Sequence, residues 1–295
     1  MTAPALGFHR SLPRYAPTPL RELEPGVWMK DESDRMGLPA FKILGASWAI
    51  ERALAERPDV DTLVCASAGN HGRAVAHEAA RRGLACRVYL PHRCAPARRE
   101  AIVGEGAEAV VVDGGYEDAV AAAGAAGAEP GCLELADVGA PGGPAEWVME
   151  GYATLFAELG RDFGVALVPA GVGSLVGAAV RWGGAAIWAV EPETAACVTA
   201  SRAAGRPVTI ETPGTTMAGL DCAEVSAAAW PLLRDGLSGT ITVSDAEAHA
   251  AMRELSERGL AIGDCGAAPL AALRKAGPFD GDVLLVATEG ITNPG

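Results

Sequence analysis

The chain has 295 residues, a formal net charge of −13 and seven cysteines, and hydrophobic residues make up 49% of it. This length is enough for two lobes or one extended α/β domain, and the negative charge disfavours nucleic acid and anionic membranes as partners. The odd number of cysteines and the lack of a Cys-x-x-Cys pair argue against a disulfide framework or a structural metal site. No stretch has the pattern of a membrane span or a signal peptide, so we expect a cytoplasmic protein.

Lysine is rare in this sequence. Only Lys30, Lys42 and Lys275 occur among the 24 basic residues. Lys42 lies between Phe41 and an apolar pair, and lysine can perform amine chemistry that arginine cannot. Apolar neighbours should ease the deprotonation of its ammonium, and a neutral amine can form a Schiff base with an aldehyde cofactor. The alternative is a lysine that snorkels to solvent at a helix start.

A short β-branched segment, a Gly-rich turn and an Ala-rich stretch recur along the chain. The predicted strands cover residues 61–66, 86–90, 109–112, 166–169, 186–190 and 283–287, and the predicted helices cover residues 70–82, 95–105 and 116–126. Apolar strands that alternate with helices indicate parallel sheets with helices on both faces. We therefore expect an α/β protein of two lobes, with a ligand in the crevice at the carboxyl ends of the strands.

Two glycine-containing turns each follow a predicted strand and precede a predicted helix. They are Ser67-Ala68-Gly69-Asn70-His71 and Gly171-Val172-Gly173-Ser174-Leu175. Free N–H groups and the positive end of a helix dipole suit such turns to a carboxylate or a phosphate. The first turn can equally be a simple glycine turn in which Ser67 or Asn70 caps the helix. The second turn lacks the third glycine of a dinucleotide fingerprint.

The order of these motifs resembles a known family. Thr288-Glu289-Gly290 ends the last predicted strand, where Thr288 can hydrogen-bond a ring nitrogen or act as a cap. Together with Phe41-Lys42 and the two turns, this resembles the fold-type II pyridoxal-phosphate enzymes, the tryptophan synthase β family. Further segments are similar to the diaminopropionate ammonia-lyase branch of that family, among them residues 8–11, 17–20, 30–33, 149–154, 190–192 and 217–220.

The resemblance implies a pyridoxal 5'-phosphate site with assigned roles. Lys42 would be the Schiff-base lysine next to Phe41, Asn70 would contact the cofactor's phenolic oxygen, and Thr288 would face its pyridine nitrogen. The cofactor phosphate would lie on the amides of Gly171, Val172, Gly173, Ser174 and Leu175. The substrate carboxylate would lie on the amides of Ser67, Ala68, Gly69, Asn70 and His71. Residues 1–47 and 148–295 would form the larger, phosphate-binding lobe, and residues 48–147 a smaller lobe that closes over the substrate.

The implied activity is β-elimination on a small L-amino acid similar to 2,3-diaminopropionate, which yields a 2-oxo acid and ammonia. Lys42 would take the α-proton as a general base. The acidic residue expected on the opposite wall corresponds to Asp137, which would bind or protonate the leaving group, although a helix cap after Ala136 is an equal alternative. Other possibilities are an L-threonine or L-serine dehydratase, a β-replacement synthase that uses the same aminoacrylate, and a non-catalytic ligand-binding relative. We expect a homodimer.

The sequence departs from the lyase pattern at three positions. Ala68 replaces the aspartate of an Asp-Gly-Asn-His motif, which in the family is the expected base for the D-isomer. We therefore expect a strong preference for L-substrates. Ile291 and Asn293 stand where the lyases usually carry aspartates.

Overall fold

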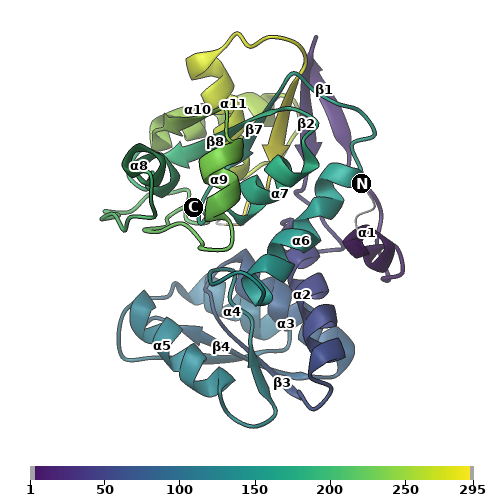
Figure 1. Cartoon of the computed structure of the whole chain (residues 1–295), viewed down its shortest axis with the longest axis vertical. Coiled ribbons are helices and arrows are strands. Elements are labelled where there is room, and N and C mark those ends of the chain that lie inside the picture. The colour runs from purple at the N-terminus through teal and green to yellow at the C-terminus, as the bar shows by residue number, and fades with distance from the viewer. Residues whose placement is uncertain (1–3, 293–295) are drawn as a thin grey trace.

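The computed structural model describes residues 4–292, so Asn293 and the outermost residues of the predicted larger lobe lie outside the described part. The described strands form two sheets (Figure 1). The larger sheet has the order β1-β2-β10-β7-β8-β9, and the smaller has the order β5-β4-β3-β6. All neighbouring strands are parallel except β1 and β2. The predicted α/β class with two mainly parallel sheets is confirmed.

The strand bounds agree closely with the predicted ones where a prediction exists. The larger sheet contains β1 (Leu20–Glu24), β2 (Val27–Asp31), β7 (Val165–Pro169), β8 (Ala186–Pro192), β9 (Gly239–Val243) and β10 (Val283–Ala287). The smaller sheet contains β3 (Thr62–Ala66), β4 (Ala85–Leu90), β5 (Glu108–Val111) and β6 (Cys132–Glu134). Strands β7 and β10 are buried along their whole length, as expected for apolar strands between two helix layers.

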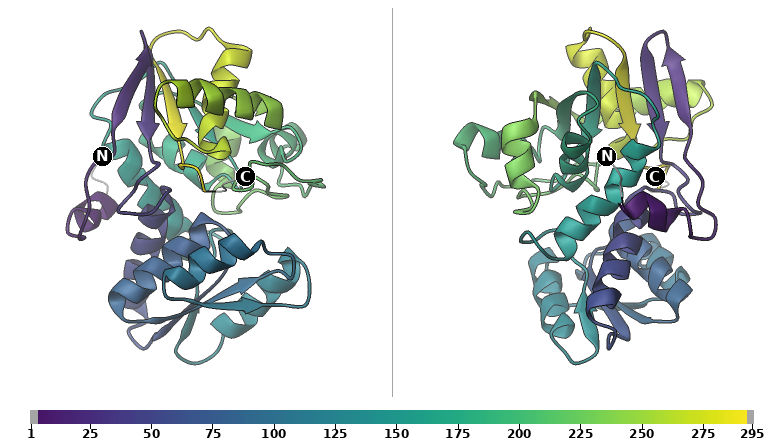
Figure 2. Two further views of the ribbon diagram at one scale, coloured as in Figure 1. Left: turned by 180° about the vertical axis from the view of Figure 1, so that it is seen from behind. Right: turned by 45° about the vertical axis from the view of Figure 1, so that its right-hand side comes forward.

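Helices cover the faces of both sheets. The first half of the chain forms α1 (Pro4–His9), α2 (Lys42–Glu56), α3 (Asn70–Arg82), α4 (Pro96–Gly104), α5 (Tyr116–Gly127) and α6 (Pro144–Ala157). The second half forms α7 (Ser174–Trp182), α8 (Cys197–Ala204), α9 (Trp230–Gly236), α10 (Asp245–Glu257) and α11 (Asp264–Ala276). Figure 2 shows α6 running obliquely from the smaller sheet towards the larger one. Both predicted lobe boundaries fall inside helices, in α2 and α6, and the two-lobe division of the chain stays a prediction.

Helices α2 and α6 cross at two glycines. A Cβ atom at Gly151 would lie 2.3 Å from the carbonyl oxygen of Leu44, and one at Gly45 would lie 2.5 Å from the ring of Tyr152. Neither position accepts a side chain without movement of the neighbouring helix. This close approach sets the place of Lys42, the first residue of α2, relative to Tyr152 of α6.

We expect Gly151→Ala to lower the free energy of unfolding by about 1–3 kcal/mol, because the added methyl group overpacks the helix crossing. The matched control is Gly124→Ala on α5, where the new Cβ would make only an ordinary contact of 3.7 Å. This control should be neutral or stabilising by up to about 1 kcal/mol. Urea unfolding of both variants checks the prediction, and equal effects at the two positions would contradict it.

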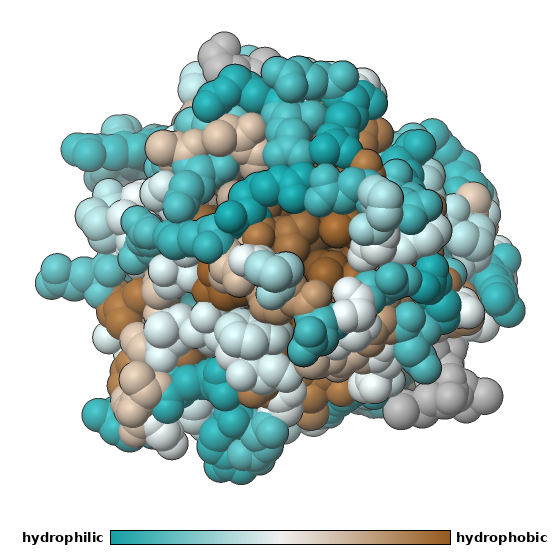
Figure 3. Space-filling view, turned by 90° about the horizontal axis from the view of Figure 1, so that it is seen from above, coloured by the Kyte–Doolittle hydropathy of each residue, from teal (hydrophilic) through white to brown (hydrophobic). Residues whose placement is uncertain are grey.

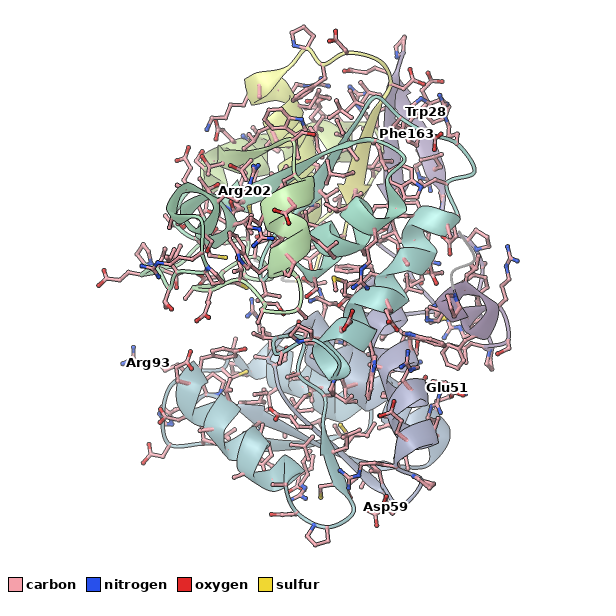
Figure 4. All side chains as sticks on the ribbon, in the orientation of Figure 1. Trp28, Glu51, Asp59, Arg93, Phe163 and Arg202 are labelled. Atoms are coloured by element: carbon pink, nitrogen blue, oxygen red, sulfur yellow. The ribbon has the colours of Figure 1, made fainter. Side chains whose placement is uncertain are left out.

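One face of the molecule is seen in Figure 3, from the end that carries the larger sheet. Hydrophilic residues (teal) lie around an apolar area (brown) near the centre of this face. Beside the larger sheet, the guanidinium of Arg161 lies over the rings of Trp28 and Phe163, at 4.8 and 5.0 Å from their centroids; both rings are labelled in Figure 4. Within residues 4–292, no helix has both the length and the apolar character needed to cross a membrane.

Candidate active site

Lys42 and Asp137 form an ion pair between two elements. Lys42 begins α2, and Asp137 lies in the loop between β6 and α6; Nζ and Oδ2 are 2.9 Å apart. Both side chains are 22% exposed, so the pair is open to a small molecule without being fully solvated. Helix α6 begins seven residues after Asp137, with Gly143 at its N-cap position. The alternative that Asp137 is a helix cap is therefore wrong.

Two aromatic rings flank the Lys42 ammonium. Nζ lies 5.5 Å from the ring centroid of Phe41 and 5.8 Å from that of Tyr152, and the two centroids are 4.7 Å apart. Such rings attract a cation to their faces. They also form an apolar wall beside the amine.

The electrostatics of the pair correct one expectation. Burial works to lower the pKa of Lys42, but the Tyr152 oxygen and the Asp137 carboxylate more than offset it, and the pKa lies above its usual value. The expectation that the apolar neighbours ease deprotonation is wrong for this site, because Tyr152 and the Asp137 carboxylate together outweigh the effect of burial. Burial likewise works to raise the pKa of Asp137, but the charge of Lys42 holds that pKa below its usual range. Lys42 is therefore an ammonium and Asp137 a carboxylate at neutral pH.

The second predicted turn lies beside this pair. It connects β7 to α7, with Gly173 at a φ of +93° that favours glycine. A Cβ atom at Gly171 would lie 2.9 Å from the sulfur of Cys222, so this position also requires glycine. The Ser174 hydroxyl donates to the carbonyl oxygen of Asp137 at 3.3 Å. The first N–H groups of α7 lack intrahelical acceptors, as at any helix start, and suit an anion.

The first predicted turn leads into α3. Gly69 is the N-cap residue, so the expectation that Ser67 or Asn70 caps this helix is wrong; Asn70 is the first helical residue instead. A Cβ atom at Gly72 would lie 2.1 Å from the carbonyl oxygen of Ser67, which keeps the turn tight. His71 is buried, and its Nε2–H donates to the carbonyl oxygen of Leu135 at 2.8 Å. That bond joins the turn to the segment that carries Asp137.

Thr288 lies at the carboxyl end of β10. Its carbonyl oxygen accepts the N–H of Phe41 at 3.2 Å, which places Thr288 next to the residue that precedes Lys42. The Asn70 side chain reaches the same region, where its Nδ2 donates to the Glu289 carboxylate. The chain segments predicted to form the cofactor site are therefore adjacent in space.

Three buried polar atoms around Lys42 have no hydrogen-bond partner in the described structure: Nδ1 of His71, Oη of Tyr152 and Oγ1 of Thr288. Buried polar atoms in folded proteins are nearly always bonded, so these atoms mark a place for a ligand that has polar groups. Pyridoxal phosphate offers a ring nitrogen, a phenolic oxygen and a phosphate, and the residues present fit it. The separate role predicted for each residue stays a prediction.

Sequence reasoning assigned no role to Tyr152 or Glu289, although both lie in segments that carry the family resemblance. The signal that could have identified Tyr152 is its neighbour Gly151, because a glycine inside an apolar helix marks a close contact. His77, by contrast, pairs with Glu105 through its Nδ1 at 2.9 Å and takes no part in the site.

Comparison with known proteins agrees with this geometry. Residues 12–289 match the model of the family described as pyridoxal-phosphate dependent enzyme. A diaminopropionate ammonia-lyase of Salmonella typhimurium is 33% identical over 84% of this chain and 74% of its own. An L-threonine ammonia-lyase of Geobacter sulfurreducens is 30% identical over 88% of this chain and 68% of its own.

A solved structure shows the same fold. The diaminopropionate ammonia lyase of Escherichia coli, in complex with D-serine, superposes with a TM-score of 0.89 at 30% identity and covers 98% of this chain and 88% of its own. The chain therefore belongs to the family of pyridoxal-phosphate dependent enzymes, and pyridoxal 5'-phosphate is its cofactor.

Proposed function

We propose that this enzyme is an ammonia-lyase that eliminates the β-amino group of a small L-amino acid of the 2,3-diaminopropionate type. The observation that carries the proposal is the ion pair of Lys42 and Asp137, 2.9 Å apart and partly open to solvent. An ionised carboxylate attracts a cationic β-ammonium group more strongly than the neutral hydroxyl of serine or threonine. The similarity to diaminopropionate ammonia-lyases supports the same substrate class.

When bound, pyridoxal phosphate supplies an aldehyde that bonds to amines and a ring that withdraws electrons from the substrate's α-carbon. Nζ of Lys42 takes the α-proton, and the Asp137 carboxylate stabilises the ammonium that this transfer forms. Asp137 also binds the departing β-amino group. The amides of residues 67–71 bind the substrate carboxylate, and those of residues 171–175 bind the cofactor phosphate. Residues 48–147 form the lobe that closes over the substrate.

A substrate panel tests this function. The holoenzyme is incubated separately with L- and D-diaminopropionate, L-serine and L-threonine, without an added nucleophile, and ammonia and 2-oxo acid are measured. We expect the fastest turnover with L-diaminopropionate and two ammonia molecules for each 2-oxo acid, because both amino groups are released. We expect little turnover of the D-isomer, because Ala68 offers no base on that face.

Other results of the same panel support other functions. Faster turnover of L-threonine or L-serine would replace the proposal with a dehydratase. The segment Ala68-Gly69-Asn70-His71 and the L-threonine ammonia-lyase relative favour this second candidate. A parallel set of incubations with an added nucleophile tests the third possibility: a substituted amino acid formed in place of the 2-oxo acid would indicate a β-replacement synthase. Cofactor binding without turnover of any amino acid would indicate a non-catalytic relative.

Asp137→Asn should lower kcat/KM for L-diaminopropionate by about 10²–10⁴-fold, the usual scale for loss of a positioned acid–base group. The loss for L-serine should be smaller, because serine presents no β-ammonium to the carboxylate. Asp59→Asn is the matched control, because Asp59 is an exposed carboxylate of the smaller lobe that pairs with Arg57 (Figure 4). Equal losses for both substrates would show that Asp137 does not select the β-substituent.

We also infer a homodimer in the cytoplasm. A mean hydropathy of +0.18 and exposed large apolar side chains support association. These exposed side chains are Val103, Val111, Tyr116, Val138 and Ile291. Light scattering after size-exclusion chromatography measures the subunit number, and a monomer across the working concentration range would contradict the dimer.

A further inference from the structure

Glu289 is a buried carboxylic acid beside the cofactor site. It is 6% exposed and follows Thr288 at the carboxyl end of β10. Its carboxylate accepts a hydrogen bond from Nδ2 of Asn70, a residue 219 positions earlier in the chain. Asn70 begins the helix that follows β3 of the smaller sheet, so this bond joins the ends of strands from both sheets.

Glu289 is crowded by other ionisable groups. Donor atoms of Asp264, Cys265 and Glu289 all lie within 4.8 Å of one another, and both partners belong to the first turn of α11. Burial and the charge of Asp264 raise the pKa of Glu289 to about 7, although Cys265, Asn70 and the charge of Lys42 act in the opposite direction. The carboxyl group therefore titrates in the neutral range.

The ionisation state of Glu289 limits which orientations of the Asn70 amide can form this hydrogen bond. A carboxylate only accepts hydrogen bonds, so it can bond to the amide nitrogen but not to the amide oxygen. The second N–H of that nitrogen has no acceptor in residues 4–292 and stays available to a ligand. A protonated Glu289 carries an O–H that can donate to the amide oxygen instead, and the amide is then free to turn over.

We propose that Glu289 is a positioning residue that holds the nitrogen of the Asn70 amide towards the phenolic oxygen of pyridoxal phosphate. Deprotonation of Glu289 fixes this donor, and protonation releases it. The inference rests on the contact between Asn70 and the cofactor that the proposed function contains. The inference does not depend on which amino acid is the substrate. The contact between Asn70 and the cofactor can be followed in the absorbance spectrum of the cofactor-loaded protein without any substrate.

The test follows the absorbance spectrum of the cofactor-loaded protein between pH 5 and 9, with pyridoxal phosphate affinity measured at each end. The wild type should show a spectral transition near pH 7. Glu289→Gln should lose this transition, because an amide does not titrate, and should bind the cofactor about tenfold more weakly above pH 7. Glu289→Asp keeps a titratable carboxyl group and should therefore keep a spectral transition. A merely structural role of Glu289 would not predict this difference between the aspartate and glutamine variants.

Asp264→Asn provides a second measurement in case Glu289→Gln does not fold. It removes the charge that raises the pKa of Glu289, so the transition should move to lower pH and persist. A transition that persists in Glu289→Gln would overturn the inference, and so would a transition that Asp264→Asn leaves at the same pH. Asn70→Ala distinguishes a failure of this inference from a failure of the proposed function. If Asn70→Ala has the same spectrum as the wild type, Asn70 does not contact the cofactor, and that part of the proposed function is wrong.

Discussion

Lys42→Ala should abolish the visible absorbance that pyridoxal phosphate acquires when it bonds to a lysine amine, and lyase activity should fall by at least about 10²–10⁴-fold. The physical reason is that neither of the other two lysines, Lys30 and Lys275, is placed to replace Nζ of Lys42. Lys30 is 1% exposed and bonds to Glu158, whereas Lys275 lies on α11 and pairs with Glu193 and Glu247. Spectra of the purified variant loaded with cofactor check this result.

Two further variants make the test specific. Lys275→Ala removes an equivalent amine from the surface and should leave both spectrum and activity unchanged. Lys42→Arg keeps the positive charge next to Asp137 but cannot bond to the aldehyde, so it should fold normally and remain inactive. Borohydride reduction should fix the cofactor on the peptide that contains Lys42 in the wild type only. A coloured and fully active Lys42→Ala protein would contradict the assignment of Lys42 as the Schiff-base lysine.

The sequence pattern predicts β3, β4, β5, β7, β8 and β10 well, because continuous apolar strands and Gly-rich turns are local signals. Helix α3 has the predicted bounds, residues 70–82, and so does strand β10, residues 283–287. The pattern does not predict β1, β2, β6 and β9. β1 and β9 lie at the two edges of the larger sheet, and their polar sequences, Leu-Arg-Glu-Leu-Glu and Gly-Thr-Ile-Thr-Val, lack an apolar run. β2 ends in the charged pair Lys30-Asp31, and β6 has only three residues.

The site is predictable only in part, for a different reason. Lys42, the two turns and Thr288 all lie where a helix or strand begins or ends. The local sequence pattern therefore places each of them at the correct edge of a sheet. The contacts that complete the site join distant segments: Lys42 to Asp137 across 95 positions and Asn70 to Glu289 across 219. Tertiary packing creates these contacts. It also reverses the expected direction of the Lys42 pKa, because Tyr152 and the Asp137 carboxylate lie beside the amine.

The largest stability effect should come from Glu158→Gln. The Glu158 carboxylate accepts hydrogen bonds from Lys30 at 2.6 Å and from Arg35 at 2.7 and 2.8 Å, and Tyr15 donates to it at 2.8 Å. With Glu32, which also bonds Arg35, the cluster contains two cations and two carboxylates, all nearly or fully buried. Glutamine leaves one buried positive charge without a counterion. We expect the free energy of unfolding to fall by about 3–5 kcal/mol at neutral pH.

The pH dependence of this effect has a definite sign. Burial works to raise the pKa of Glu158, but the hydrogen bond and charge of Arg35 and the charge of Lys30 lower it from the ordinary value of 4.5. Its contribution to stability is therefore complete above pH 4.5 and is lost as the pH falls through the lowered pKa. The wild type should therefore lose stability over that acid range. Glu158→Gln has no carboxylate at this position, so its free energy of unfolding should lack this part of the pH dependence.

Charge balance gives a sharper test than the single variant. Lys30→Met in the Glu158→Gln background removes the unpaired cation and should recover part of the lost stability, so the two substitutions are strongly non-additive. Glu254→Gln is the matched control, because its carboxylate is partly exposed and bonds Arg258 and Arg274 on the surface. That change should cost at most about 1 kcal/mol. Urea unfolding measures both variants. If Glu254→Gln and Glu158→Gln destabilise the protein equally, charge balance in the buried cluster does not contribute to stability, and the cluster contributes through packing alone.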